Sequence, residues 1–308
     1  MKKYLTYDDV NIVPKYSEVL SREDIDLSTR FTKNTTMSVP IVASPMDTVT
    51  EYKMASEMLD QGGVGVIHRF QSIEKQTEQM KRVWRQWDSW YNIGDKDEDR
   101  TDHHRVYEDW YRGVMSWNHP PTKSDFEDLE ELLWFADEAK KDEEYWSKRP
   151  LCAAIGVKGD YLERAKELVL NGCNVLLIDV AHGHHKNVGE AIEKIKSKIS
   201  NVEVVAGNIA TSDGARFLAE KGADAIRVGI GNGSLCETRI RTGVGLPQVT
   251  ALIDVCSVAD DWDIPIIADG GIRNVGDVAK GLGCGADTIM VGSLLSGTKE
   301  SPGQIEKQ

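Results

Sequence analysis

The sequence predicts a (β/α)8 barrel of the TIM type. Short runs of β-branched and other apolar residues recur along the chain, and most are followed by a stretch with helical patterning. Such apolar runs are typical of parallel strands buried on both faces, and the helices provide the crossovers that parallel strands need. Eight such units within roughly 250 residues are typical of this barrel. The predicted strands cover residues 40–43, 63–68, 151–157, 174–181, 203–209, 225–230, 265–270 and 288–293.

The alternative fold is a doubly wound open sheet, which collects its functional residues at one topological switch point. In this chain, chemically suggestive residues follow nearly every predicted strand. The strands of a barrel all end at one face, where the loops carry the reactive side chains. The barrel is therefore the favoured fold, and we expect the functional site at the carboxyl ends of its strands.

The alternation breaks between the second and third strands, at residues 84–150. This segment holds seven of the eight tryptophans and two acidic patches, residues 95–99 and 125–131. The simplest interpretation is a small, mostly helical insert with a tryptophan core and solvated acidic faces. The alternative is a packing surface for another subunit, because aromatic residues are enriched at interfaces. We expect a barrel domain of residues 1–83 and 151–308 and an insert of residues 84–150.

Composition excludes several classes of partner. A net charge of −13 argues against nucleic-acid binding, which requires a basic face. The amino terminus lacks the apolar core of a signal peptide, and no apolar run approaches the length of about 18 residues that a membrane span needs. The five cysteines are widely spaced without a C-x-x-C pair, so neither a disulfide framework nor a zinc site is expected. We expect a soluble, cytoplasmic protein with free thiols.

A glycine-rich loop with a cysteine follows the strand predicted at residues 225–230. Gly229, Gly231 and Gly233 alternate in it, which frees the backbone for positive φ and for close approach to a ligand. A Rossmann turn would need a different glycine spacing and a helix opening on it, so dinucleotide binding of that type is rejected. An isolated cysteine is most simply a small buried residue. This loop instead presents the Cys236 thiol at the end of a strand.

Three histidines follow the strand predicted at residues 174–181. His182, His184 and His185 invite a metal interpretation, but no carboxylate or further ligand lies at a useful local spacing. We do not expect a metal site there.

Glycine-rich turns also end the last two predicted strands. Backbone N–H groups in such turns form a nest that suits a phosphate, and barrels often bind phosphate at this location. The simpler interpretation is that the glycines only close the turns, but the pairing of both loops favours binding. The residues concerned are Asp269, Gly270, Gly271, Gly292 and Ser293.

Other polar groups would complete a site for a nucleoside monophosphate. Ser234 would add a hydroxyl donor, and an ionised Asp269 would accept hydrogen bonds from both hydroxyls of a ribose. Ser44 and Met46, from the loop after the first strand, would cover the base. The predicted ligand is therefore a nucleoside monophosphate.

The loop of residues 229–248 resembles the catalytic-cysteine loop of the IMP dehydrogenase and GMP reductase family. The resemblance extends over residues 1 to about 83 and 151–303. Several ordered motifs carry it, and their length makes chance similarity very improbable. The other matching segments are residues 5–10, 44–50, 207–211, 268–273 and 292–298.

The resemblance implies a covalent mechanism. The Cys236 thiolate would add to C2 of the purine, hydride would pass to a nicotinamide cofactor, and water would release the resulting thioimidate. Thr238 matches a family threonine that helps to position water or a leaving amine. Glu300 matches a carboxylate that works with this threonine in the reductases.

The resemblance also implies the cofactor, the ion and the assembly. Asp179 would hold the nicotinamide riboside, and Asn208 would make similar polar contacts near the reacting ring. Gly229 and Gly231 would lie close to the cofactor. NAD is the expected cofactor, with NADP as the alternative. Backbone carbonyls of Gly231, Gly233 and Cys236 would bind potassium. Family members are commonly homotetramers.

The resemblance favours the dehydrogenase branch over the reductase. Residues 181–184, 268–273 and 298–303 match the dehydrogenases better, whereas residues 179–181 and the missing regulatory domain pair match the reductases better. Family members continue past the last strand with a helix and a flap whose Arg-Tyr pair activates water, and the sequence ends at Gln308. Three explanations stay open: an incomplete sequence, a second polypeptide that supplies the flap, or a purine-nucleotide-binding protein without catalysis.

Overall fold

The computed structural model describes residues 3–91, 149–233 and 238–303. The chain divides into two compact units, one of Met1–Trp84 with Pro150–Gln308 and one of Arg85–Arg149. Most of the second unit lies outside the described residues. The mostly helical insert and the exact domain boundaries therefore stay predictions.

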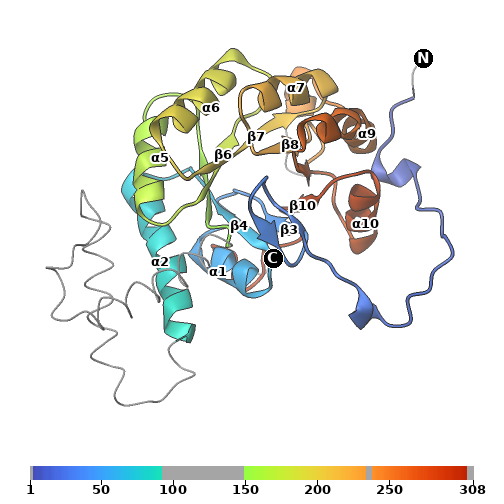
Figure 1. Cartoon of the computed structure of the whole chain (residues 1–308), viewed down its shortest axis with the longest axis horizontal. Helices are drawn as coiled ribbons and strands as arrows, with labels where there is room; N and C mark the ends of the chain where they lie inside the picture. The colour runs from blue at the N-terminus through green and yellow to red at the C-terminus, as the bar shows by residue number, and fades with distance from the viewer. Residues whose placement is uncertain (1–2, 92–148, 234–237, 304–308) are drawn as a thin grey trace, which may run out of the picture. The chain divides into compact units, whose positions relative to one another are not determined.

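Eight parallel strands close into a barrel in the order β10-β3-β4-β5-β6-β7-β8-β9 (Figure 1). This arrangement confirms the predicted (β/α)8 barrel and excludes the open sheet. Each of the eight predicted strands is present, most of them shorter by one to three residues than the apolar run that predicted it. The strands are β3 (Ile41–Ala43), β4 (Val64–Ile67), β5 (Cys152–Ile155), β6 (Val175–Asp179), β7 (Glu203–Ile209), β8 (Ala225–Val228), β9 (Ile266–Asp269) and β10 (Thr288–Val291).

Amphipathic helices follow the strands and surround the barrel (Figure 1). Several begin at side chains that cap the first turn: the Thr211 hydroxyl accepts a hydrogen bond from Gly214 N, and Asn274 Oδ1 accepts one from Asp277 N. The helices are α1 (Tyr52–Asp60), α2 (Ile73–Tyr91), α5 (Tyr161–Leu170), α6 (Lys186–Lys198), α7 (Ser212–Glu220), α8 (Thr238–Thr242), α9 (Gln248–Ala259) and α10 (Val275–Gly283). Within the described residues, no helix has both the length and the apolar character to span a membrane.

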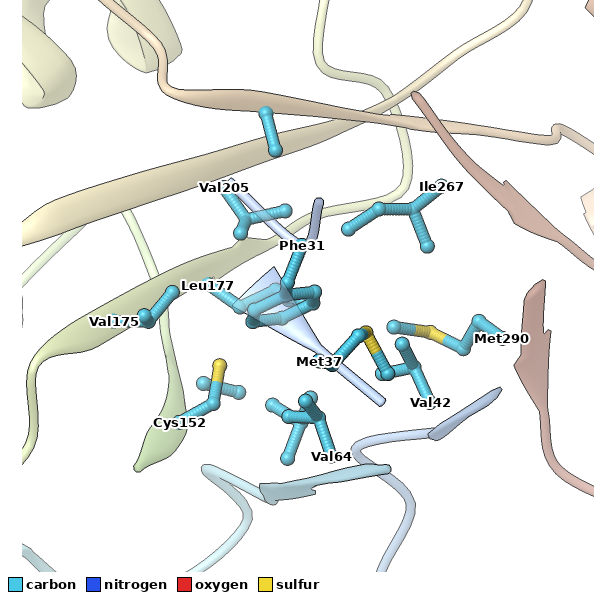
Figure 2. Close-up of a cluster of buried hydrophobic side chains, with 13 residues drawn as sticks. Phe31, Met37, Val42, Val64, Cys152, Val175, Leu177, Val205, Ile267 and Met290 are labelled. Carbon is cyan, nitrogen blue, oxygen red and sulfur yellow. The ribbon is translucent and has the colours of Figure 1, made fainter. Parts of the chain in front are cut away.

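A small antiparallel hairpin of β1 (Thr29–Arg30) and β2 (Thr36–Met37) closes the amino ends of the strands. Phe31 and Met37 belong to the buried cluster that also contains side chains of the barrel strands (Figure 2). The first residue of β7, Glu203, holds the turn of the hairpin. Its carboxylate accepts hydrogen bonds from the hydroxyls of Thr32 and Thr35, each at 2.5 Å.

This hairpin covers one end of the barrel, and the sequence did not predict it. Its strands are two residues long, too short for an alternating pattern to be visible.

Candidate functional site

A cavity of about 470 Å³ opens at the carboxyl ends of the strands. Its volume lies within the range of small-molecule sites, roughly 300–1,000 Å³. The carboxyl ends of seven of the eight strands, or the loops that follow them, line it, all except β5 and its loop. The described lining residues include Ser44, Met46, Arg69, Phe70, Asp179, Asn208, Arg227, Gly229, Gly231, Gly233, Thr238, Asp269, Gly270, Gly271, Gly292 and Ser293.

The floor of the cavity is organised by Arg227, in the middle of β8. Its Nη1 donates to Asp179 Oδ1 and its Nε donates to Asp269 Oδ2, both at 2.9 Å. The side chain is buried, with 7% of the residue exposed. Burial alone would lower the pKa of this guanidinium, but Asp269 and Asp179 hold it above its ordinary value. The arginine therefore stays charged and fixes both carboxylates at the ends of β6 and β9.

Asn208 links the same carboxylate to the glycine loop. Its Nδ2 lies 2.7 Å from Asp269 Oδ2 and 2.8 Å from the carbonyl oxygen of Gly229. Oδ2 of Asp269 thus accepts from both Asn208 and Arg227, whereas Oδ1 has no donor among the described residues. One carboxylate oxygen is held by the protein and the other is left for a ligand.

Arg69 and Phe70 form the wall that follows β4. Arg69 Nε lies 3.1 Å from the carbonyl oxygen of Asp179 and 3.5 Å from its Oδ2. The guanidinium lies over the Phe70 ring, 4.9 Å from its centroid. Phe70 is exposed, so it presents a flat apolar surface at the rim of the cavity.

The glycine loops approach each other too closely for side chains. A Cβ on Gly229, whose φ is +148°, would lie 1.8 Å from the carbonyl oxygen of Asp269. A Cβ on Gly270 would lie 3.0 Å from the backbone nitrogen of Gly233. The loops after β8 and β9 therefore pack backbone against backbone at these two glycines, which only residues without a Cβ allow.

Two amides hold the loop after β8 in place. Asn232 Nδ2 donates to Gln248 Oε1 and to the carbonyl oxygen of Leu246, both at 2.7 Å. Gln248, the first residue of α9, is buried and its Nε2 donates to the carbonyl oxygen of Val228. The loop is thus fastened at both ends to the barrel.

The cavity brings together most of the predicted site residues, from Ser44 and Met46 to Gly292 and Ser293. Glu300 is half-buried in a turn beyond β10 and does not line the cavity. Ser234 and Cys236 lie outside the described residues. Their roles, and that of the potassium ligands, stay predictions.

Asn208 occupies the end of β7 itself rather than the loop after it, because this strand is the longest of the eight.

The sequence analysis missed Arg69 and Arg227. The available signal for Arg227 was a charged residue inside an otherwise apolar strand, since such a group is buried only when it is paired.

A closed parallel barrel with a polar cavity at the carboxyl ends of its strands is the architecture of a (β/α)8-barrel enzyme. The cavity adds two carboxylates that share one arginine, and facing glycine turns.

Comparison with known proteins identifies the family. Residues 4–308 match the model of the IMP dehydrogenase / GMP reductase domain, and the chain belongs to this family. It is similar to the inosine-5'-monophosphate dehydrogenase of Cryptosporidium parvum, with 41% identity over 304 residues, 99% of this chain and 70% of that protein. The protein of the same name from Borreliella burgdorferi is also 41% identical, over 98% of this chain and 72% of the relative. That of Escherichia coli strain K12 is 35% identical, over 99% of this chain and 76% of the relative.

Proposed function

We propose that this protein oxidises IMP to XMP with NAD. Membership of the family carries the proposal, and the cavity supports it. The turns at Gly270–Gly271 and Gly292–Ser293 would bind the phosphate through backbone N–H groups, and the free Oδ1 of Asp269 would accept from a ribose hydroxyl. Ser44 and Met46 would lie against the base, and Ser234 would donate to the phosphate.

In the proposed reaction Cys236 is the nucleophile. The thiolate sulfur forms a bond to C2 of the hypoxanthine, and the hydrogen on C2 then leaves as hydride. Water attacks the resulting thioimidate at C2, the carbon–sulfur bond breaks, and XMP and the thiolate are released. IMP, NAD and water are thereby converted to XMP, NADH and a proton. Thr238, which lines the cavity, would position the water, and Glu300 would assist it.

The residues near Arg227 fit a nicotinamide cofactor, whose chemistry is to accept hydride. Asp179 is fixed by Arg227 and Arg69 and would accept hydrogen bonds from the riboside. Asn208 would lie beside the reacting ring, and Gly229 and Gly231 would allow its close approach. Carbonyl oxygens of Gly231, Gly233 and Cys236 would hold potassium.

Two spectrophotometric assays test the proposal. We expect absorbance of NADH to rise when the protein is mixed with IMP and NAD, and we expect no reaction with GMP and NADPH. Consumption of NADPH with GMP would instead show a reductase. IMP binding without turnover in either assay would show a nucleotide-binding protein. Cys236→Ala should bind IMP but form no NADH.

The localisation and the oligomeric state are part of the same proposal. We place the protein in the cytoplasm as a homotetramer, as the resemblance implies, with the insert of residues 84–150 as a separate unit. Light scattering of the full chain tests the tetramer, and a monomer would contradict it.

A further inference from the structure

The amino-terminal clip, residues 5–9, packs against the helices α9 and α10 (Figure 1). Leu5 N donates to Thr250 Oγ1 at 2.7 Å, and Thr250 N donates back to the carbonyl oxygen of Leu5 at 3.2 Å. Further along the clip, Lys280 Nζ donates to the carbonyl oxygen of Tyr7 at 2.8 Å. The clip is thus fastened to α9 through Thr250 and to α10 through Lys280.

The short 3-10 helix η1 (Tyr7–Asp9) turns one side chain of the clip into the protein. Asp9 Oδ2 accepts hydrogen bonds from Thr6 N and Thr6 Oγ1, both at 2.7 Å, and these bonds hold the turn. Asp8 and Asp9 are exposed, whereas Tyr7 is 2% exposed. Tyr7 is the only buried residue of the clip.

The Tyr7 ring contacts the turn that follows β9. A Cβ on Gly271 would lie 3.4 Å from Cδ2 and Cε2 of this ring, whereas a Cβ on Gly270 would lie 3.0 Å from Gly233 N. The turn therefore lies against Tyr7 at one glycine and against the loop after β8 at the other. Since two glycines with positive φ have no side chains to anchor them, the position of the turn depends on what packs against it.

The far end of the Tyr7 side chain reaches α10. A Cβ on Gly281 would lie 3.1 Å from Tyr7 Oη. This hydroxyl is buried and has no hydrogen-bond partner among the described residues. Burial, together with Cys284, Asp277 and Asp269, raises the pKa of Tyr7, so the hydroxyl keeps its proton. A buried hydroxyl without a partner contributes nothing favourable, which leaves the ring as the part that supports the turn.

We propose that Tyr7 is a positioning residue for the turn that binds the substrate phosphate, an assignment that rests on the proposed function. The ring fills the space between Gly271 and Gly281 and thereby fixes the direction of the backbone N–H groups of the turn. Such donors bind an anion best when they are held in place before it arrives. The pair of Asp8 with Arg273 lies close by, but both side chains are exposed and the pair contributes little.

Calorimetric binding of IMP and of inosine to the full chain tests the proposal. Inosine lacks the phosphate, so the ratio of its Kd to that of IMP measures what the phosphate contributes. Tyr7→Leu should lower this ratio by roughly 10-fold or more, because one lost hydrogen bond to a charged group costs about that factor. Tyr7→Met, whose flexible side chain fills space without a flat ring, should show the same fall. Tyr7→Phe keeps the ring and should bind both ligands like the natural protein.

Phe31→Leu is the matched control. Phe31 is also a fully buried aromatic residue, but it belongs to the cluster beneath the hairpin at the amino ends of the strands. It should lose stability and keep the ratio of the natural protein. Equal falls of the ratio in Tyr7→Leu and Phe31→Leu would show general loosening and overturn the proposal. An unchanged ratio in Tyr7→Leu, or a lowered one in Tyr7→Phe, would also overturn it.

The outcome is separable from that of the proposed function, because calorimetry needs no turnover. Oxidation of IMP with a ratio independent of Tyr7 would remove the role of this residue and leave the reaction. A Tyr7-dependent ratio without oxidation of IMP would do the reverse, and equal affinity of the natural protein for IMP and inosine would contradict both. With turnover, KM for IMP should rise in Tyr7→Leu and KM for NAD should not.

Discussion

Arg227 and Asp269 are joined across the neighbouring strands β8 and β9 by a hydrogen bond of 2.9 Å between Nε and Oδ2. The same guanidinium reaches Asp179 on β6 through Nη1, so one buried arginine spans two carboxylates that belong to separate strands. The forked guanidinium donates to both at once through two different nitrogens. The side chain thereby couples the proposed ribose-binding and cofactor-binding halves of the site.

Replacing Arg227 should therefore affect stability and activity differently. Arg227→Ala leaves two carboxylates without their cation and should lower the free energy of unfolding by about 3–5 kcal/mol. Arg227→Lys keeps the charge but contacts one carboxylate at a time, so we expect a smaller loss of stability and a fall in kcat/KM of about 100-fold. Urea denaturation and initial rates measure the two effects.

The control for this substitution is Arg30→Ala. Arg30 pairs with Asp263 at 2.6 Å, but the two side chains are 40% and 83% exposed, so the loss of unfolding free energy should stay below about 1 kcal/mol. Similar losses of unfolding free energy in the Arg227 and Arg30 variants would show that burial does not determine how much these ion pairs contribute to stability.

The thiols should differ in reactivity. Burial raises the pKa of Cys173 to about 12 and, together with Cys173, raises the pKa of Cys152 well above its ordinary range. Since the thiolate is the reactive form, neither should react with iodoacetamide at pH 8 in the folded protein. We expect Cys236 to react first and IMP to protect it, as followed by peptide mass spectrometry. Labelling of Cys173 as fast as Cys236 would contradict both the burial and the proposed nucleophile.

Much of the barrel was predictable because its strands are buried on both faces, which leaves long apolar runs in the sequence. The glycines of the site were predictable for a local reason. Gly229 and Gly270 adopt positive φ and have no room for a Cβ, so the requirement for glycine is visible in the sequence. Arg227 was not, because its partners lie 42 and 48 residues away along the chain. Only the closed barrel brings such groups together, and a pattern read along one strand does not contain that information.

The hairpin at the closed end of the barrel should contribute to stability through Glu203. Its Oε2 accepts from Thr32 and Thr35, which are 0% and 3% exposed, and its Oε1 accepts from Asn34 N and Nδ2. Glu203→Ala leaves these buried hydroxyls without an acceptor, and we expect a loss of about 2–3 kcal/mol of unfolding free energy. Glu203→Gln keeps an acceptor oxygen and should lose less. Thermal unfolding followed by circular dichroism gives both values, and a neutral Glu203→Ala would mean that the hairpin does not need this carboxylate.

Gly229 should tolerate no side chain. At Gly229→Ala the new Cβ would lie 1.8 Å from the carbonyl oxygen of Asp269, and the φ of +148° is strained for any residue with a side chain. The ends of β8 and β9 must then move apart, which displaces the Gly229 carbonyl from Asn208 and opens the cavity between them. We expect the affinity for IMP, measured by calorimetry, to fall at least 10-fold, along with a loss of stability.

Gly283→Ala is the control, because Gly283 ends helix α10 and a Cβ there would meet only Ile12, at 3.6 Å. It should bind IMP normally and unfold at the same temperature or slightly higher, since alanine favours a helix over glycine by about 1 kcal/mol. Normal binding by Gly229→Ala would show that this backbone contact does not shape the site.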